Sequence, residues 1–272
     1  MGGTNARAAV VTDNAIQTIQ SERVNGSGSY DEVLQTLYKV TDAVMQDSVQ
    51  AIGMGVPSVV DIETGVVYDV QNIPAWQEVP LKKLLEERYK VPVFVNNDAN
   101  CFALGEAYFG QGQNSSSMVG LTIGTGLGAG IIINKKLYAG PNCGAGEFGM
   151  VAYLDKHYEW YASGQFFNNK YGIDGEAVFE QAKRGEARAL EMYQEFGMHL
   201  GNALKMILYT YDPALIILGG SVRHAYELFQ KPMWQQLEDF VYPRSVQRLQ
   251  LKISDLHNSG VLGAAALFFD AL

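Results

Sequence analysis

From residue 96 the chain carries three motifs in succession: Asn96-Asn97-Asp98-Ala99-Asn100, then Leu121-Thr122-Ile123-Gly124-Thr125-Gly126-Leu127-Gly128-Ala129-Gly130, then Gly144-Ala145-Gly146-Glu147-Phe148-Gly149. The first motif is typical of a helix start, because Asn and Asp side chains accept hydrogen bonds from the unpaired amides there. The second is a glycine-rich turn between β-forming segments, and the third is a loop that carries one acid. The order of the three is far more specific than any one of them.

The glycine turn predicts a hairpin with strands over residues 118–123 and 130–134. Glycine adopts positive φ at little cost, so Gly124, Gly126, Gly128 and Gly130 mark a place where backbone can approach a ligand. The amides of Gly124, Thr125 and Gly126, with the Thr125 hydroxyl, would form an anion-binding nest for the phosphates of ATP. The alternative is a hairpin that needs its glycines for geometry alone.

Two other glycine-loop types do not fit this turn. It is not a Walker loop, since no Lys-Ser or Lys-Thr follows the glycines. It is not a dinucleotide fingerprint either, since β-forming residues rather than a helix come next.

Asp98 is the candidate general base. A carboxylate at a helix start is held by backbone donors at the edge of a sheet, where it can reach a substrate hydroxyl. Phosphoryl transfer asks little else of a protein than positioning, charge neutralisation by a metal, and such a base. The alternative is that Asp98 only caps the helix expected over residues 99–109. The neighbouring Asn97 and the downstream loops favour the catalytic interpretation.

Two further acids are candidate ligands of a polyhydroxylated substrate. Glu147 lies in the glycine-rich loop, and Glu159 lies in His157-Tyr158-Glu159-Trp160-Tyr161. Carboxylates accept hydrogen bonds from vicinal hydroxyls, although a solvated surface acid is the commoner fate of Glu. No metal site is predicted, because the four histidines are scattered and no Cys-x-x-Cys occurs.

Apolar spacing along the rest of the chain predicts alternating helices and strands, which is typical of an α/β fold. The expected strands cover residues 5–12, 51–56, 91–95, 118–123, 130–134 and 214–218. The expected helices cover residues 31–50, 81–90, 99–109, 186–209 and 260–272.

The bulk properties exclude several classes of protein. A chain of 272 residues with 47% hydrophobic content can bury a large core, and we expect two lobes with a cleft between them. The net charge of -9 argues against nucleic acid and anionic membranes as partners. No apolar run is long enough to span a bilayer, and no secretory signal opens the sequence. Cys101 and Cys143 are too few for a disulfide framework, so we interpret both as reduced thiols of a cytoplasmic protein.

The first residues repeat the glycine turn. Gly2-Gly3-Thr4 leads into the strand expected over residues 5–12, as Gly124-Thr125-Gly126 leads into its own strand. The second turn also has a strand before it, whereas the first has only Met1. Because a hairpin needs two arms, we expect that the first strand is absent from this sequence and that coding sequence for it lies upstream of Met1.

Together these motifs resemble those of the ROK family of bacterial sugar kinases and related repressors, which have the two-lobed actin and hexokinase (ribonuclease H-like) fold. Gly2-Gly3-Thr4 is similar to the end of the family's first phosphate motif, Asp-x-Gly-Gly-Thr, and Gly124-Thr125-Gly126 is similar to the second. Leu218-Gly219-Gly220 resembles the adenosine-site motif. The resemblance covers nearly the whole chain.

The sugar side of the family site is matched as well. Asn97-Asp98 resembles the segment with the catalytic Asp, and Gly146-Glu147-Phe148-Gly149 resembles the Gly-Glu-x-Gly-His loop up to its last residue. Glu159, followed by Tyr161-Ala162-Ser163-Gly164, is similar to the second sugar-binding Glu and its Tyr-Ala-Ser-Gly run.

The resemblance implies phosphoryl transfer from magnesium-ATP to the 6-hydroxyl of a hexose or N-acetylhexosamine by a cytoplasmic homodimer. It implies that Asn97, Asp98, Glu147 and Glu159 hold the sugar and that Asp98 takes the proton. The implied ATP-binding residues are Gly2, Gly3, Thr4, Gly124, Thr125, Gly126, Gly219 and Gly220. The implied lobes are residues 1–108 plus 257–272, and residues 109–256.

Three departures from the family pattern carry their own expectations. Met150 stands where the family has a His that contacts sugar and zinc, and the zinc-binding Cys-x-Cys-x-x-x-x-Cys insert is missing, so we expect no structural zinc. Tyr153, Tyr158, Trp160 and Tyr161 are expected to support the loop by packing instead. The third departure is the absent first Asp, which in the family helps to place magnesium and the transferring phosphate.

A second hypothesis therefore stays open beside the kinase. Met150 and the absent first Asp favour a catalytically weak or inactive sugar-binding or sensing protein of the same family, whereas Asp98 favours an enzyme. Which hexose is bound also stays open, because epimers differ by one hydroxyl.

Overall fold

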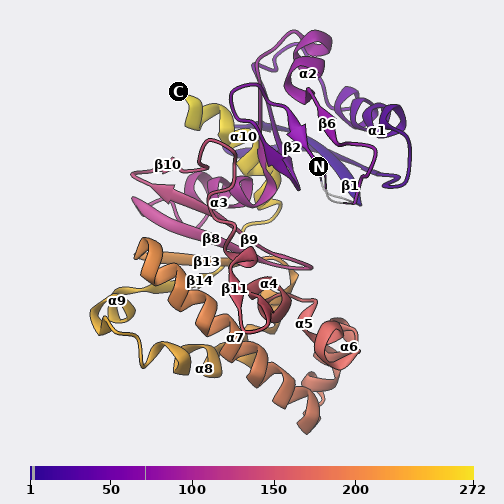
Figure 1. The fold of residues 1–272 in the computed structure, drawn as a ribbon. Coiled ribbons are helices and arrows are strands. Elements are labelled where there is room, and N and C mark those ends of the chain that lie inside the picture. Colours follow the sequence, from indigo (N-terminus) through magenta and orange to yellow (C-terminus); the bar gives the residue numbers. More distant parts are fainter. Residues whose placement is uncertain (2–3, 71) are drawn as a thin grey trace. The chain divides into compact units, whose positions relative to one another are not determined.

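The computed structural model describes residues 1, 4–70 and 72–272, which form two compact units (Figure 1). Unit 1 comprises Met1–Ser116, Gly130–Ala145 and Asp255–Leu272, and unit 2 comprises Ser117–Ala129 and Gly146–Ser254. Helices and strands alternate in both units, which agrees with the predicted α/β class. The expected phosphate-site residues Gly2 and Gly3 lie outside the described residues.

Unit 1 contains two separate pairs of long strands. β1 (Asn5–Thr12) pairs antiparallel with β2 (Ala15–Arg23), and β3 (Ile52–Val56) pairs in parallel with β7 (Val93–Asn97). Within the described residues, β1 and β3 each pair with a strand along one edge. β2 is not among the predicted strands because most of its side chains are exposed, so it carries no run of buried apolar residues.

Short strands complete the β-structure of unit 1. β4 (Val59–Val60), β5 (Val67–Tyr68) and β6 (Glu78–Val79) form a small antiparallel sheet over fully buried Trp76. β10 (Lys136–Leu137) pairs antiparallel with the end of β9 (Leu127–Ile133), which belongs to unit 1 from Gly130 on.

The helices of unit 1 are α1 (Tyr30–Asp42), α2 (Leu81–Tyr89), α3 (Asp98–Phe109) and α10 (Ser259–Ala271). α1 begins with a capping box, in which the Glu32 amide donates to Ser29 Oγ and the Ser29 amide donates to Glu32 Oε2. The prediction that this helix runs to residue 50 was wrong. The apolar spacing continues past Asp42, but the polar run Gln46-Asp47-Ser48 favours a loop.

α3 and α10 pack at very short range. A Cβ atom on Gly263 would overlap the carbonyl oxygen of Cys101, and one on Gly105 would overlap that of Ser259. Glycine at these two positions therefore lets the two backbones touch. This contact fixes α3, and with it the residues at its N-terminus.

Unit 2 is built on a sheet in which β13 (Leu215–Gly219) is central. β13 pairs in parallel with β8 (Ser117–Ile123) on one side and with β14 (Gln250–Ile253) on the other. All five β13 side chains are buried, as expected of a central parallel strand. The first residues of β9 follow β8 in this sheet.

The helices of unit 2 are α4 (Tyr158–Ala162), α5 (Phe166–Tyr171), α6 (Gly175–Lys183), α7 (Ala187–Tyr211), α8 (Tyr226–Leu237) and α9 (Pro243–Arg248). α7 is the longest element of the chain, and α8 runs beside it (Figure 1). The buried face of α7 includes Phe196, Leu200, Leu204 and Ile207, as the helical spacing predicted. Short pieces join these helices: β11 (Ala152–Tyr153), β12 (Lys156–His157), and the 3-10 turns η1 (Phe148–Met150) and η2 (Ser221–Ala225).

Two predicted strands differ in their bounds. β7 begins at Val93 rather than residue 91, because Lys90 ends α2 in the left-handed conformation and Pro92 has no amide to pair. β9 begins at Leu127 rather than residue 130, because Gly128 and Gly130 continue the strand instead of extending the turn.

Candidate functional site

The junction between β7 and α3 places Asn97 and Asp98 side by side in unit 1. Asn97 is the N-cap of α3, and its Oδ1 accepts a hydrogen bond from the Ala99 amide at 2.8 Å. The Nδ2 of Asn97 donates to the Ser58 carbonyl at 3.2 Å. The alternative that Asp98 serves only as the cap is therefore wrong. Asn97 does the capping, and Asp98 is the first helical residue.

Desolvation raises the pKa of the Asp98 carboxyl above its ordinary value. The Met1 amino group and the amides of Ala99 and Asp98 itself act in the opposite direction, although they do not cancel the effect. Asp98 is nevertheless exposed, so its carboxylate is accessible to a substrate. A raised pKa makes a carboxylate a stronger base, which suits proton abstraction from a hydroxyl.

A buried polar cluster lies behind this junction. Asn96 Oδ1 accepts hydrogen bonds from the Asn97 amide at 2.8 Å, from Asn100 Nδ2 at 2.8 Å and from Cys143 Sγ at 2.9 Å. The oxygen of one side chain thus links the end of β7, the first turn of α3 and the loop before Glu147. Cys143 and Cys101 are both buried, and neither forms a disulfide, as predicted.

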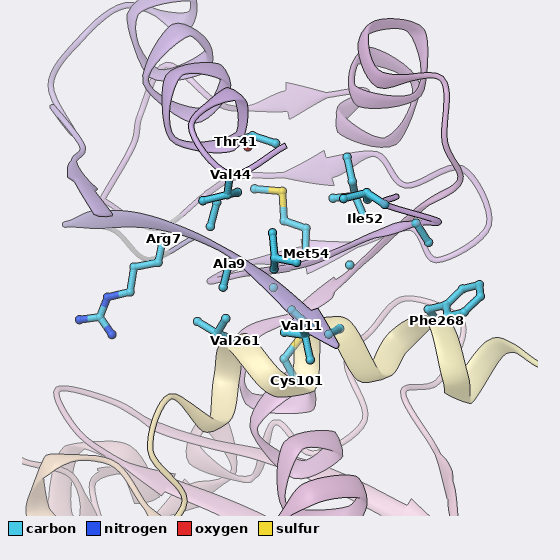
Figure 2. Close-up of a pocket in the computed structure, with 18 of the residues that line it drawn as sticks. Arg7, Ala9, Val11, Thr41, Val44, Ile52, Met54, Cys101, Val261 and Phe268 are labelled. Atoms are coloured by element: carbon cyan, nitrogen blue, oxygen red, sulfur yellow. The ribbon is translucent and has the colours of Figure 1, made fainter. Parts of the chain in front are cut away.

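A cavity of about 750 Å³ lies inside unit 1, next to Asp98. Figure 2 shows Ala9 and Val11 of β1 on one side and Met54 of β3 on another, with Val261 of α10 and Cys101 of α3 nearby. The cavity is therefore bounded by one strand of each pair, β1 and β3, and by helices that include α3 and α10. The Met1 amino group lies in it and donates to the carbonyl of Gly55 in β3. Thr4, just before β1, also lines it.

In unit 2, the predicted phosphate turn joins β8 to β9. The Gly124 amide donates to the Gly126 carbonyl at 3.0 Å, and Gln165 Nε2 donates to the Thr125 carbonyl at 2.8 Å. The expectation that these glycines supply positive φ was wrong: Gly124, Gly126, Gly128 and Gly130 are not among the glycines of the described residues that adopt it. A Cβ atom on Gly124 would meet nothing within 4 Å, so a ligand can approach the backbone there.

Glu159 contacts the same turn. Its Oε2 accepts a hydrogen bond from the Leu127 amide at 2.9 Å, and it would lie 2.7 Å from a Cβ atom on Gly126. The space beside Gly126 is thus filled by protein, which explains this glycine by close packing. Glu159 is half-buried in the first turn of α4, so the alternative that it is a solvated surface acid does not hold.

The loop that carries Glu147 runs along the start of β9. A Cβ atom on Gly146 would overlap the Ala129 carbonyl, and one on Gly149 would lie 2.5 Å from the Leu127 carbonyl and 3.3 Å from Glu159 Cβ. Both glycines are therefore required by close approach. Between them the side chain of Glu147 is exposed. Unit 2 thus brings Glu147, Glu159 and the glycine turn together along one strand.

The motif Gly219-Gly220 lies beside this turn, because Gly219 pairs in parallel with Thr122. Gly220 has a φ of 77°, and a Cβ atom there would overlap the Ile123 carbonyl. Arg223 fixes the loop by donating to the carbonyls of Gly220 at 2.7 Å and Ser254 at 3.2 Å. Ligands of open α/β sheets bind outside the carboxyl ends of parallel strands, which is where these residues lie.

Sequence reasoning missed the residues that hold the site residues in place. Ser58, Gln165 and Arg223 act through hydrogen bonds to an amide side chain or to backbone carbonyls, and such contacts leave no local sequence signal. Over the described ranges, no three His, Cys, Asp or Glu side chains gather as a metal-ligand set. No helix in that part of the chain is both long and apolar enough to cross a membrane.

Comparison with known proteins gives a consistent result. The model of the ROK family matches residues 1–271. The glucokinase of Thermotoga maritima is 26% identical, with 98% of this chain and 95% of that protein aligned. The N-acetyl-D-glucosamine kinase of Pectobacterium atrosepticum is 31% identical over 85% of this chain and 84% of that protein. The xylose repressor of Bacillus subtilis is 29% identical, and the match covers 80% of this chain and 61% of the repressor.

Among solved structures, a ROK family glucokinase from Streptomyces griseus in complex with glucose and AMPPNP superposes with a TM-score of 0.80. It is 28% identical, and the match covers 98% of this chain and 96% of that one.

Proposed function

Because the chain belongs to the ROK family, we propose that it transfers a phosphoryl group from ATP to the 6-hydroxyl of a hexose or N-acetylhexosamine. The observation that carries the proposal is at the start of α3. Asn97 caps the helix, so the Asp98 carboxylate stays available at an accessible, desolvated position. A carboxylate of this kind accepts the proton of an attacking hydroxyl.

The remaining residues have roles in binding. We assign Asn97, Asp98, Glu147 and Glu159 to the sugar, because amide and carboxylate groups hydrogen-bond vicinal hydroxyls. We assign Gly2, Gly3, Thr4, Gly124, Thr125 and Gly126 to the phosphates of ATP, and Gly219 and Gly220 to its nucleoside. The open space at Gly124 and the sharp turn at Gly220 suit a nucleotide approaching the backbone. Magnesium bound with the nucleotide supplies charge neutralisation at the phosphates.

A coupled ADP-release assay tests this function on glucose, mannose, fructose, N-acetylglucosamine and N-acetylmannosamine. We expect turnover of at least one sugar, and we expect Asp98→Asn to lower its kcat by about 100-fold or more, the usual contribution of a general base. Asp69→Asn is the matched control. Asp69 is exposed in unit 1 with a φ of 47°, a conformation that Asn tolerates, so this variant keeps its activity. Equal activity of both variants would refute the role of Asp98.

The alternative function is sugar binding without turnover. The similarity to a xylose repressor favours it. Calorimetric titration with the same sugars separates the two: binding of a sugar that gives no ADP release would support a sensor, and ADP release supports the kinase.

We also propose that the cavity between β1 and β3 holds one further β-strand. Both strands are paired along one edge within the described residues, and the cavity separates them. Since β3 already accepts a hydrogen bond from Met1 at Gly55, a strand there would continue that contact. The ADP-release assay on an N-terminally extended version checks this: faster turnover by the extended version supports the strand, and equal turnover by both versions contradicts it.

Three predictions that follow from the resemblance stay proposals: a cytoplasmic location, a homodimer, and the absence of structural zinc. Sedimentation measures the oligomeric state. Elemental analysis of the purified protein measures zinc, and one zinc per chain would contradict the last of these.

A further inference from the structure

The helix that carries Glu159 cannot be stable by itself. α4 has five residues, and isolated helices this short do not form in water. Its own cap is weak: His157 Nδ1 lies 3.4 Å from the Trp160 amide and 3.2 Å from the Gly149 carbonyl, and it cannot accept from the first while it donates to the second. The position of Glu159 must therefore be set by what α4 packs against.

Aromatic rings join α4 to α7 through the hairpin of β11 and β12. The ring of Tyr153 in β11 stacks on that of Tyr158 in α4, with centroids 4.3 Å apart and an angle of 14°. His199 of α7 packs against Tyr153 at 5.6 Å and against Tyr161 of α4 at 4.7 Å. The predicted packing support of this loop is thus present, and it ends on a histidine that the sequence analysis left unassigned.

Hydrogen bonds connect the same side chains, and each donor points toward Glu195. Asn202 Nδ2 donates to the Met198 carbonyl at 3.0 Å, which identifies this atom as the nitrogen, and also to the Tyr153 hydroxyl at 3.2 Å. The Glu195 carboxylate beside Nε2 can only accept, so in the neutral ring Nδ1 is the acceptor, and the Tyr153 hydroxyl donates its proton to it at 3.1 Å. His199 then carries its proton on Nε2, which faces Glu195 Oε1 at 3.4 Å.

Glu195, at the far end of this series of hydrogen bonds, is itself held by other residues. Glu195 forms an ion pair with Lys170 and accepts a hydrogen bond from the Tyr171 hydroxyl, both from α5. His199 itself is buried, and burial lowers its pKa. The favoured form is therefore the neutral ring, which this series of hydrogen bonds requires. α7 and α5 together hold the hydroxyl of Tyr153 at a fixed point.

We propose that His199 and Tyr153 are positioning residues for substrate: through the hydrogen bond between them, α7 holds α4 in the place where Glu159 meets both the glycine turn and the sugar. This rests on the proposed function for its effect on turnover. The affinity for sugar is then controlled by a buried histidine that belongs to none of the site motifs.

The test compares Tyr153→Phe with Tyr158→Phe. Both variants keep the stacked rings and remove one hydroxyl, but only the first breaks the hydrogen bond to His199. We expect Tyr153→Phe to raise the KM for the best-used hexose of the panel about fivefold, the value of one hydrogen bond, and to leave the KM for ATP unchanged. Tyr158→Phe leaves both constants unchanged.

A double-mutant cycle with His199→Phe sharpens the result. Because His199→Phe and Tyr153→Phe remove the same bond, the double variant raises the hexose KM no further than either single variant. If the fold-changes in hexose KM of the two single variants multiply in the double variant, the two residues act independently and the proposal is overturned. So would an equal rise in the KM for ATP, which would indicate a general loosening of unit 2.

One measurement does not depend on activity. Lys156 is exposed in the β11–β12 hairpin, so trypsin cleavage after it reports local opening of the hairpin. We expect Tyr153→Phe to be cut about fivefold faster than the parent chain and Tyr158→Phe to be cut at the parent rate. Equal rates for the two variants would overturn the proposal even if the parent phosphorylates no sugar, and unequal rates without turnover would overturn only the kinase assignment.

Discussion

Asp98 shows at the scale of one residue how a site can oppose stability. Desolvation raises its pKa, so the folded protein favours the neutral carboxyl, whereas the proposed role as a general base needs the charged one. Activity is therefore expected to fall as the pH drops through this raised pKa, at a higher pH than for an ordinary Asp. The unfavourable contribution of the charge to stability is present above that pKa and disappears below the ordinary one.

Asp98→Asn separates these two effects. The variant is expected to have a higher melting temperature than the parent at pH 8, because it removes the desolvated charge, and to lose turnover. The difference in melting temperature is expected to shrink between pH 8 and pH 4, because the parent carboxyl becomes neutral as the pH falls through its raised pKa. Thermal unfolding followed by circular dichroism at both pH values measures it, and an Asn variant that melts below the parent at pH 8 would contradict the argument.

Gly124 and Gly126 are two residues apart, and their surroundings predict that a methyl group impairs the binding of a different substrate at each position. In Gly126→Ala, the added carbon displaces the Glu159 carboxylate from 2.7 Å, so the Leu127 amide loses its acceptor. We expect an increase of about fivefold in the KM for hexose, as for one lost hydrogen bond. Gly124→Ala meets nothing within 4 Å, so it disturbs only a ligand and raises the KM for ATP. The ADP-release assay measures both, and a reversed pattern would contradict the separate effects predicted for the two glycines.

At the scale of elements, the contact between α3 and α10 determines how firmly Asp98 is held. Gly263→Ala would place a methyl group on the Cys101 carbonyl, and separating two packed helices costs about 1–3 kcal/mol of unfolding free energy. Gly260→Ala, one turn earlier in α10, meets nothing within 4 Å and is expected to stabilise by about 0.5–1 kcal/mol through helix propensity. Urea denaturation measures the two changes, and equal midpoints would refute the close contact.

The elements that the sequence predicted well are those with a single strong pattern. α7 and β13 were found because one has a long apolar face and the other an unbroken buried run. β2 and the last eight residues expected for α1 failed because their outcome depends on neighbours that a local pattern does not contain. The site divides in the same way. Asn97, Glu159 and the glycine turn appear as motifs, whereas Arg223 and His199 act through contacts with distant segments.

At the scale of the whole molecule, net charge helps to distinguish the proposed kinase from a DNA-binding regulator. With 29 acidic and 20 basic residues, the chain repels a phosphate backbone over most of its surface, and binding DNA requires several Lys or Arg contacts to phosphate. We expect no change in the electrophoretic mobility of duplex DNA at micromolar protein and about 50 mM salt, the condition that most favours such contacts. A shift that weakens on raising the salt to about 200 mM would instead reveal a local basic surface and favour the regulatory alternative. Because sugar binding is common to both hypotheses, the mobility measurement is made with and without glucose, and only a shift altered by the sugar would identify a sensor acting on DNA.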